Sequence, residues 1–145
     1  DAPSTITRLQ NMGTPDYLIS AACSLVLAQR LARKTCKDCR VPDEDVTPKV
    51  LTDLGFSPEQ ASRVKATKGK GCPKCKDSGY KGRMGIYEVM KVTKPIKEAI
   101  LKQATTPELK AIAIKEGFQT MQDMGRKMIA AGDLNFREYE RVLSG

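Results

Sequence analysis

Two Cys-x-x-Cys pairs constrain the fold of this chain more than any other feature of its sequence. Cys36 and Cys39 form the first pair, and Cys72 and Cys75 form the second after 32 intervening residues. Each pair can form a tight turn that directs two sulfur atoms at one point, and four thiolates complete a tetrahedral shell. The long intervening segment adds little cost, because loop-closure entropy grows only logarithmically with length. The pattern therefore predicts a structural zinc site; the alternatives are two unconnected reduced pairs or disulfides.

The surrounding sequence favours metal over disulfides. It contains no secretory signal and no long apolar run, which is typical of a cytosolic chain, and paired cysteines there are more often metal ligands or redox groups. A thioredoxin-like pair would lie at a strand–helix junction, whereas we expect Cys36 to follow a helix. Four sulfur ligands leave no position for water, so no catalysis is expected at the metal. Cys23 lies outside both pairs and is predicted to be a small buried core residue.

Positive charge surrounds the cysteines and dominates the chain. Zinc with four thiolates has a formal charge of −2, which nearby cations would offset while lowering the thiol pKa values. The cations closest in sequence are Lys34, Lys37, Arg40, Lys74 and Lys76. The whole chain has 25 Lys+Arg against 17 Asp+Glu, a net charge of +8 that indicates an acidic partner: nucleic acid, an anionic membrane or an acidic protein surface. Aromatic residues are only 5%, little for an independent core, which suggests a piece of a larger protein.

Helix signals dominate the N-terminal half. Apolar spacing and stop residues predict helices over residues 5–13 and 15–34. The stretch from Leu18 to Leu27 is apolar or small on every side, which is typical of a buried helix and too short to span a bilayer. Two short helices are expected between the cysteine pairs, where Thr47 and Ser57 can cap a helix that has proline at its first position.

The C-terminal half holds one clear strand signal. Met84–Met90 alternates so that Ile86, Glu88 and Met90 share one face. The rest is predicted to be helical. The expected helices cover about 95–103, then Thr105 or Thr106 to about 115, then a segment that contains Met121, Met124 and Met128 and stops at Gly132, and finally about 135 onward.

Two basic features have alternative explanations. Arg30 and Arg33 lie three residues apart, so they would share a helix face. They either form a solvated end that complements the helix dipole or contact a phosphate or a neighbouring subunit. The basic loop Lys65–Gly71 lacks the G-x-x-x-x-G-K-[ST] order of a phosphate loop, so we do not predict a nucleotide site there.

Several of these stretches resemble one family, the secretion ATPases. Residues 1–9 resemble the segment that follows their His box, and Gln29-Arg30-Leu31 resembles another of their motifs. The two cysteine pairs and the following Gly79-Tyr-x-Gly-Arg-x-Gly-Ile-Tyr-Glu88 run resemble their tetracysteine signature. The tail from Gly117 onward is similar to their C-terminal helices. The combination points to the assembly ATPases of type IV pili and type II secretion rather than to the retraction ATPases, which generally lack the tetracysteine site.

The resemblance implies a mainly α fold with a small zinc-bound β element, in three parts. Residues 1–35 would be terminal helices of a truncated RecA-like α/β ATPase domain, 36–90 a tetracysteine zinc-binding subdomain, and 91–145 a C-terminal helical subdomain. The sequence has no Walker A, Walker B, acidic or His box, elements that would lie upstream of Asp1 in a complete member. The chain is therefore expected to be an interaction and structural piece without ATPase activity of its own, whereas its parent would bind ATP and Mg2+.

The resemblance also implies partners. The parent would be a cytoplasmic homohexamer, peripheral at the inner membrane, that contacts an inner-membrane platform protein and has no transmembrane segment. Arg8, Arg30 and Arg33 then become candidates for contact with nucleotide or a neighbouring subunit. The alternative function is an independent zinc ribbon that binds nucleic acid. The basic segment Lys65–Lys76 lacks the aromatic residues that such a binder interleaves with its cations, so no nucleic acid partner is expected.

Overall fold

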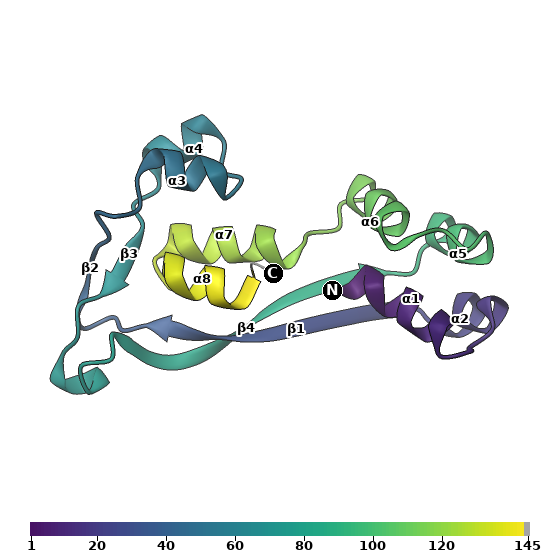
Figure 1. The fold of residues 1–145 in the computed structure, drawn as a ribbon, viewed down its shortest axis with the longest axis horizontal. Helices are drawn as coiled ribbons and strands as arrows, with labels where there is room; N and C mark the ends of the chain where they lie inside the picture. The colour runs from purple at the N-terminus through teal and green to yellow at the C-terminus, as the bar shows by residue number, and fades with distance from the viewer. Residues whose placement is uncertain (144–145) are drawn as a thin grey trace. The chain divides into compact units, whose positions relative to one another are not determined.

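A computed structural model describes residues 1–143 of the chain. Figure 1 shows helices and strands that follow one another in a mixed order along the chain. The helices in the described part are α1 (Ala2–Asn11), α2 (Asp16–Ala22), α3 (Pro48–Asp53), α4 (Pro58–Arg63), α5 (Lys94–Leu101), α6 (Thr106–Lys115), α7 (Met121–Ala131) and α8 (Phe136–Leu143), with a 3-10 turn η1 (Pro73–Cys75). The strands are β1 (Leu25–Thr35), β2 (Arg40–Pro42), β3 (Thr67–Gly69) and β4 (Tyr80–Lys91). The predicted mainly helical fold with a small β component is confirmed at this coarse level.

Local capping explains most of the helix starts. Ser57 accepts a hydrogen bond from the Gln60 amide at 3.2 Å, and the Gln60 side chain returns one to the Ser57 amide at 3.1 Å. Thr105 and Glu108 form the same reciprocal box at the start of α6. Each box satisfies two amide groups that a helix start would otherwise leave without partners. The predicted short helices after Thr47 and Ser57, and the end of α7 before Gly132, are confirmed.

The predicted helix over residues 15–34 is wrong after Ala22, because strand β1 replaces it from Leu25 to Thr35. The expected burial on every side is wrong as well: Leu18, Leu25 and Leu27 are 47%, 51% and 54% exposed. Leucine, alanine, glutamine and arginine favour helix locally, but pairing with β4 outweighs that weak preference. In the resulting strand Val26 and Ala32 are buried, whereas Leu25 and Leu27 lie on the opposite, exposed face.

Strand β4 has the predicted alternation and is longer than predicted. Ile86, Glu88 and Met90 are buried, while Tyr87 and Val89 between them are exposed. The strand begins at Tyr80, four residues before the predicted start at Met84. β1 and β4 form one two-stranded sheet and run in opposite directions in Figure 1, and β2 and β3 form a second, antiparallel one. The prediction of a single strand was therefore wrong.

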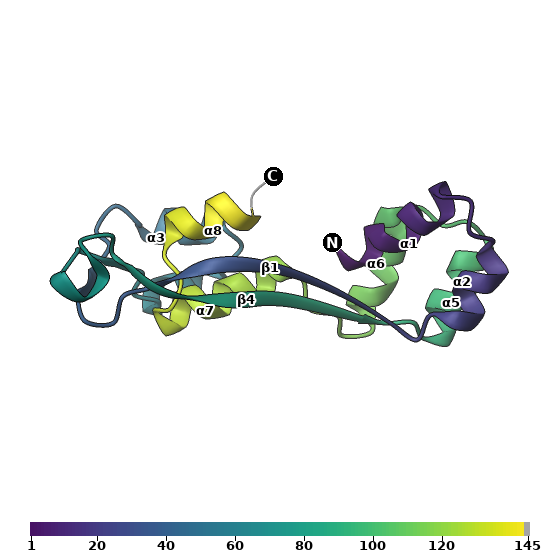
Figure 2. The same cartoon turned by 90° about the horizontal axis from the view of Figure 1, so that it is seen from below.

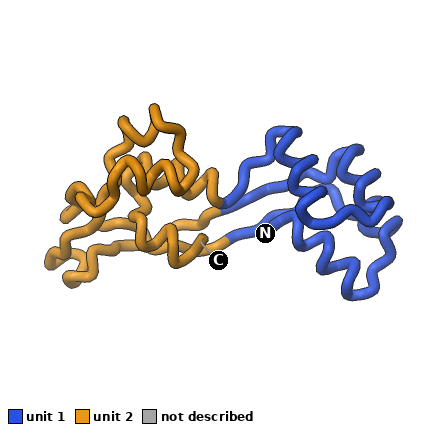
Figure 3. The backbone as a smooth tube through the Cα atoms, turned by 45° about the horizontal axis from the view of Figure 1, so that its top comes forward, with its two compact units in different colours: residues 1–29, 87–121 blue, residues 30–86, 122–145 orange. Residues whose placement is uncertain are grey.

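The chain divides into two compact units, shown in separate colours in Figure 3. Unit 1 comprises residues 1–29 and 87–121, and unit 2 comprises residues 30–86 and 122–145, of which the structure describes those up to 143. Within unit 1, α2 packs on α5 and α1 packs on α6, as Figure 2 shows. The core residues of this unit include Ile6, Ile19, Met90, Ile96 and Leu109.

A buried carboxylate ties two segments of unit 1 to strand β4. Glu88 is only 3% exposed. Its Oε1 accepts a hydrogen bond from the Ala2 amide, and its Oε2 accepts one from the Met121 amide at 2.9 Å. Ala2 and Met121 are the first residues of α1 and α7, so one negative charge meets the positive ends of two helix backbones. Glu88 therefore supplies an acceptor to each of two buried amides.

Unit 2 contains the cysteine pairs and the short β2–β3 sheet. In this sheet Arg40 pairs with Gly69, Val41 with Lys68 and Pro42 with Thr67. α3 packs on α4, and Arg126 on α7 donates a hydrogen bond to the Leu54 carbonyl at 3.1 Å. Among residues 1–143, no helix combines the length and the apolar character that crossing a membrane would require.

Candidate metal centre

The structure brings the four predicted ligands together. The Sγ atoms of Cys36, Cys39, Cys72 and Cys75 all lie within 4.8 Å of one another. The Cys36–Cys72 and Cys39–Cys75 separations are both 3.8 Å, and the Cys72–Cys75 separation is 3.6 Å. Zinc–sulfur bonds of about 2.3 Å in a regular tetrahedron require sulfur atoms about 3.8 Å apart. The sulfur positions therefore fit a four-coordinate metal ion of that size, and Cys23 takes no part in the group.

Two turns present these sulfurs. In the second pair, Cys72 immediately precedes the 3-10 turn η1 and Cys75 is its last residue. Lys76 and Asp77, which follow, both adopt left-handed backbone conformations, with φ of 55° and 61°. This sharp reversal sends the chain back across the cluster. The first pair lies between the end of β1 and the start of β2.

Backbone amides form a second layer around the sulfurs. The Gly71 amide donates a hydrogen bond to Cys39 Sγ, and the Cys72 and Gly79 amides each donate one to Cys75 Sγ, all at 3.3 Å. Such donors favour the thiolate that a metal needs and hold Cys39 and Cys75 in place. The sequence did not indicate Gly71 as part of the site, and it indicated Gly79 only as the first residue of the run that resembles the tetracysteine signature.

Gly79 is the residue that joins the two cysteine pairs. Its amide bonds Cys75 Sγ, and its carbonyl accepts a hydrogen bond from the Cys36 amide at 3.0 Å. Its φ of 80° is left-handed, and a Cβ there would lie 2.6 Å from the Gly69 carbonyl oxygen. No other residue type fits this position. The signal in the sequence is a glycine four residues after Cys75.

The thiols have unequal proton affinities. Burial opposes ionisation of Cys75, but the amides of Gly79 and Cys72 outweigh it and lower the pKa to about 6. Burial raises the pKa of Cys39 to about 12 despite the hydrogen bond from Gly71. The Cys75 thiolate is therefore favoured near neutral pH, whereas a bound cation would have to displace the proton of Cys39.

The candidate arginines lie in different surroundings. Arg8 is exposed on α1. Arg30 donates a hydrogen bond to the Val142 carbonyl at 2.5 Å. Arg33 pairs with the fully buried Glu138, whose Oε1 is 3.0 Å from Arg33 Nη2, and its guanidinium lies 4.1 Å from the centre of the Tyr80 ring. Arg30 and Arg33 thus have partners within unit 2, and their contact with nucleotide or a subunit stays a prediction.

We expect the Glu138 network to make stability depend on acid pH. Burial would raise the pKa of Glu138, but hydrogen bonds from Arg141 and Arg33 outweigh it and lower the pKa to about 2. A lowered pKa gives stability that is present above the unfolded value of about 4.5 and is lost as the pH falls towards 2. The free energy of unfolding, measured against pH, should therefore fall more steeply below about pH 5 in the natural chain than in Glu138→Gln. Parallel curves for the two proteins would contradict this role.

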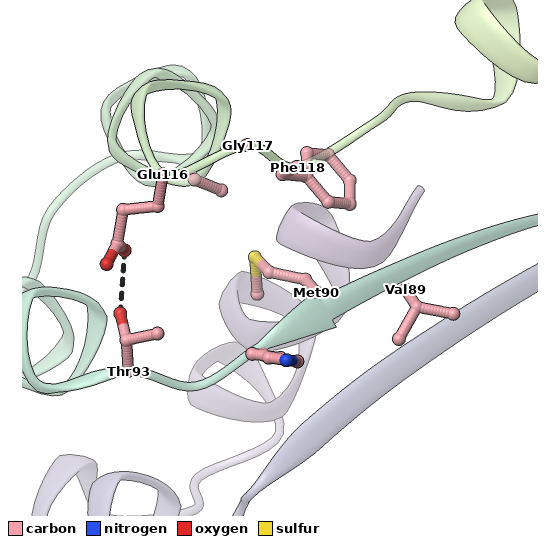
Figure 4. Close-up of a pocket in the computed structure, with 8 residues that line it drawn as sticks. Val89, Met90, Thr93, Glu116, Gly117 and Phe118 are labelled. Carbon is pink, nitrogen blue, oxygen red and sulfur yellow. Dashed lines mark hydrogen bonds between the residues drawn. The ribbon is translucent and has the colours of Figure 1, made fainter.

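A hollow of about 330 Å³ lies elsewhere, in unit 1, against the end of β4. Figure 4 shows Met90, Phe118 and Val89 along it, with Thr93 and Glu116 facing each other. The Thr93 hydroxyl donates a hydrogen bond to Glu116 Oε1 at 2.6 Å, so these two polar groups satisfy one another. We assign no chemistry to this hollow.

The known proteins that are similar to this chain are of the kind that its cysteine signature resembles. The family described as "Type II/IV secretion system protein" matches residues 1–141. The type IV pilus assembly ATPase PilB of Myxococcus xanthus is 38% identical over 138 residues, which are 95% of this chain and 24% of that protein. PilB of Pseudomonas aeruginosa is 37% identical over 141 residues, 97% of this chain and 25% of that protein. The type II secretion system ATPase E of Vibrio cholerae is 33% identical over 142 residues, 97% of this chain and 27% of that protein. The chain spans about a quarter of the length of these three relatives.

Proposed function

Because the chain belongs to the type II/IV secretion system protein family, we propose that it is the C-terminal, zinc-braced interaction region of a hexameric ATPase that powers type IV pilus assembly or type II secretion. The observation that carries the proposal is the four-sulfur group, whose separations suit zinc, in a chain similar to these ATPases along its length. Identities of 36–40% to pilus assembly relatives, against 32–33% to type II secretion relatives, favour pilus assembly.

In this proposal zinc is the metal and its role is structural. Four sulfur ligands close the shell, so the ion would brace the two cysteine segments. ATP and Mg2+ would bind to the rest of the parent protein, which would act as a homohexamer on an inner-membrane platform protein. Residues 1–35 would complete a RecA-like domain, 36–90 would form the zinc subdomain and 91–145 the C-terminal helical subdomain. The nucleic-acid-binding alternative gains no support from the relatives.

We predict that the isolated chain does not hydrolyse ATP. It has no segment in the order of a phosphate loop and no acidic group placed to hold Mg2+ beside one. Phosphate release by the purified chain should equal that of a buffer blank, whereas the full-length parent protein should release phosphate. If the chain hydrolyses ATP, and this activity disappears when its arginines are replaced, the proposal that ATP binds only to the rest of the parent protein is refuted.

The exposed face of β1 provides a second test. Leu25 and Leu27 lie together with Tyr87 and Val89 on the uncovered side of the β1–β4 sheet within unit 1, where 43–54% of each residue is exposed. We propose that the rest of the RecA-like domain covers this face in the parent. Apolar burial contributes roughly 25 cal/mol per Å², so we expect the isolated chain to self-associate through it.

Changing Leu25 and Leu27 to serine should then make the chain more monomeric in sedimentation without loss of zinc. The matched control is Leu101→Ser with Ile114→Ser, which also removes two half-exposed apolar residues of unit 1. If the serine changes in β1 instead unfold the chain, this face belongs to its own core, and the proposal that the rest of the RecA-like domain covers it is wrong.

A further inference from the structure

Helices α7 and α8 form a tight hairpin in unit 2, and Figure 1 shows them side by side. A Cβ on Gly125 of α7 would lie 2.5 Å from the Leu143 side chain of α8, so the two helices touch at that point. Residues 132–135 connect them, and we call this connection the α7–α8 loop. Leu134 of the loop is fully buried, and its amide donates a hydrogen bond to the Met128 carbonyl at 3.3 Å. The loop is therefore held firmly by its own hairpin.

Three polar contacts join the α7–α8 loop to the segments that carry the cysteines. The Asp133 carbonyl accepts a hydrogen bond from the Thr35 amide at 3.0 Å. The Asp133 carboxylate lies 3.4 Å from Arg40 Nη2. The Asn135 side chain donates a hydrogen bond to the Tyr80 hydroxyl at 2.9 Å. Thr35 and Asn135 are both buried, so water competes little for their hydrogen bonds.

Each of these three partners is a chain neighbour of a residue in the metal centre. They are the residue before Cys36, the residue after Cys39 and the residue after Gly79, which bonds both cysteine pairs. A fourth contact reaches β3, where the Thr67 hydroxyl donates a hydrogen bond to the Gly132 carbonyl at 3.4 Å. One loop therefore holds both cysteine segments at points directly beside the sulfur group.

Such support should increase the affinity of the cysteines for a metal ion. Metal binding and folding are coupled at sites of this kind, so the observed affinity includes the cost of ordering the ligand segments. Strands β2 and β3 have three residues each and supply little order by themselves. A loop that already holds these segments reduces the ordering that remains to be done when the ion binds.

We propose that the α7–α8 loop positions the cysteine ligands, so that zinc affinity and the order of the C-terminal hairpin depend on each other. Asp133 and Asn135 are positioning residues here, because they act through Thr35 and Tyr80 and do not touch the ion. The coupling is reciprocal: the factor by which the docked loop raises zinc affinity is also the factor by which zinc stabilises the docked loop. This inference rests on the structural zinc of the proposed function.

The test variants break the bond between Asn135 and Tyr80 from either side. Asn135→Ser keeps an oxygen that can cap α8, as Asn135 does by accepting the Glu138 amide at 2.8 Å, but serine is too short to reach the Tyr80 hydroxyl. Tyr80→Phe keeps the ring under Arg33 and removes only the hydroxyl. Competition with a zinc chelator should show about a tenfold loss of affinity for each variant. The double variant should lose no more than the weaker-binding single variant, because both changes remove the same bond.

Tyr139→Phe is the matched control for these variants. Tyr139 is a buried tyrosine of α8 whose hydroxyl bonds Arg126 of α7, so its loss weakens a bond within the hairpin and not one to the residues beside the cysteines. Its zinc affinity should change by less than about twofold.

Hydrogen exchange in the natural chain tests the reciprocal effect without any substitution. Removal of zinc by a chelator should accelerate exchange of the Thr35 and Leu134 amides by about tenfold, with the Leu109 amide of unit 1 as the internal reference. In Asn135→Ser the same treatment should have a smaller effect on the Leu134 amide. A loop that stabilises only its own hairpin would instead exchange equally fast with and without zinc.

The outcomes separate this proposal from the zinc assignment. Unchanged zinc affinity in both test variants would overturn the proposal, as would an equal loss in Tyr139→Phe. If the natural chain binds zinc but its removal leaves exchange of the loop amides unchanged, the proposal fails and the zinc site stands. If the natural chain binds no zinc, the metal assignment in the proposed function is wrong, and this proposal falls with it.

Discussion

The Cys72→Ser variant should lose its zinc and, with it, the fold of residues 36–83. Strands β2 and β3 have three residues each, and a two-stranded sheet of that length is not stable in water by itself. Structural zinc contributes roughly 10–16 kcal/mol of apparent folding free energy in small zinc domains near pH 7. Metal analysis should give about one zinc for the natural chain and almost none for the variant. Hydrogen exchange should lose its protection at the Cys36 and Lys70 amides, which bond the Gly79 and Cys39 carbonyls.

Cys23→Ser is the matched control for this experiment. Cys23 is a free cysteine in unit 1 that packs against the core there and lies outside the four-sulfur group. This variant should keep its zinc and the exchange protection of Cys36 and Lys70. Metal analysis that finds almost no zinc in the purified natural chain would contradict the assignment of the ligands. So would loss of zinc in Cys23→Ser.

The second large effect is expected from Glu88→Gln. This change preserves the volume of the side chain but removes its charge, and it places an amide NH2 against one of two backbone donors, those of Ala2 and Met121. A buried donor without an acceptor costs about 1–3 kcal/mol, and the lost charge weakens the remaining bond. We therefore expect unit 1 to lose about 2–4 kcal/mol of stability in urea unfolding. Amide exchange at Ala2 and Met121 should accelerate more than at other helix starts.

Glu98→Gln provides the comparison, because Glu98 is an exposed glutamate on α5 in the same unit. Its substitution should change the stability by less than about 0.5 kcal/mol. If the two variants are equally stable, the Glu88 carboxylate does not hold the two helix starts together.

The sequence by itself determined the features that depend on residues close together in the chain. Helix starts at Ser57 and Thr105 were predictable, since each cap bonds an amide three residues away. The four-cysteine group was predictable because each Cys-x-x-Cys turn places two sulfurs close together by local geometry. The two turns then have only to meet to complete the group. The alternation of Ile86, Glu88 and Met90 identified β4 for the same reason.

Only the tertiary structure decided what depends on a distant partner. Residues 25–34 favour helix by composition, and they form a strand because β4, which begins 45 residues after β1 ends, pairs with them. The role of Glu88 could not be read from its own neighbours, because its donors lie 86 and 33 residues away. Gly79 belongs to the metal centre for a similar reason: its carbonyl meets an amide of the other cysteine pair. Hydrogen bonds and strand pairs between remote segments form only when the whole chain is packed, so no local pattern of residues encodes them.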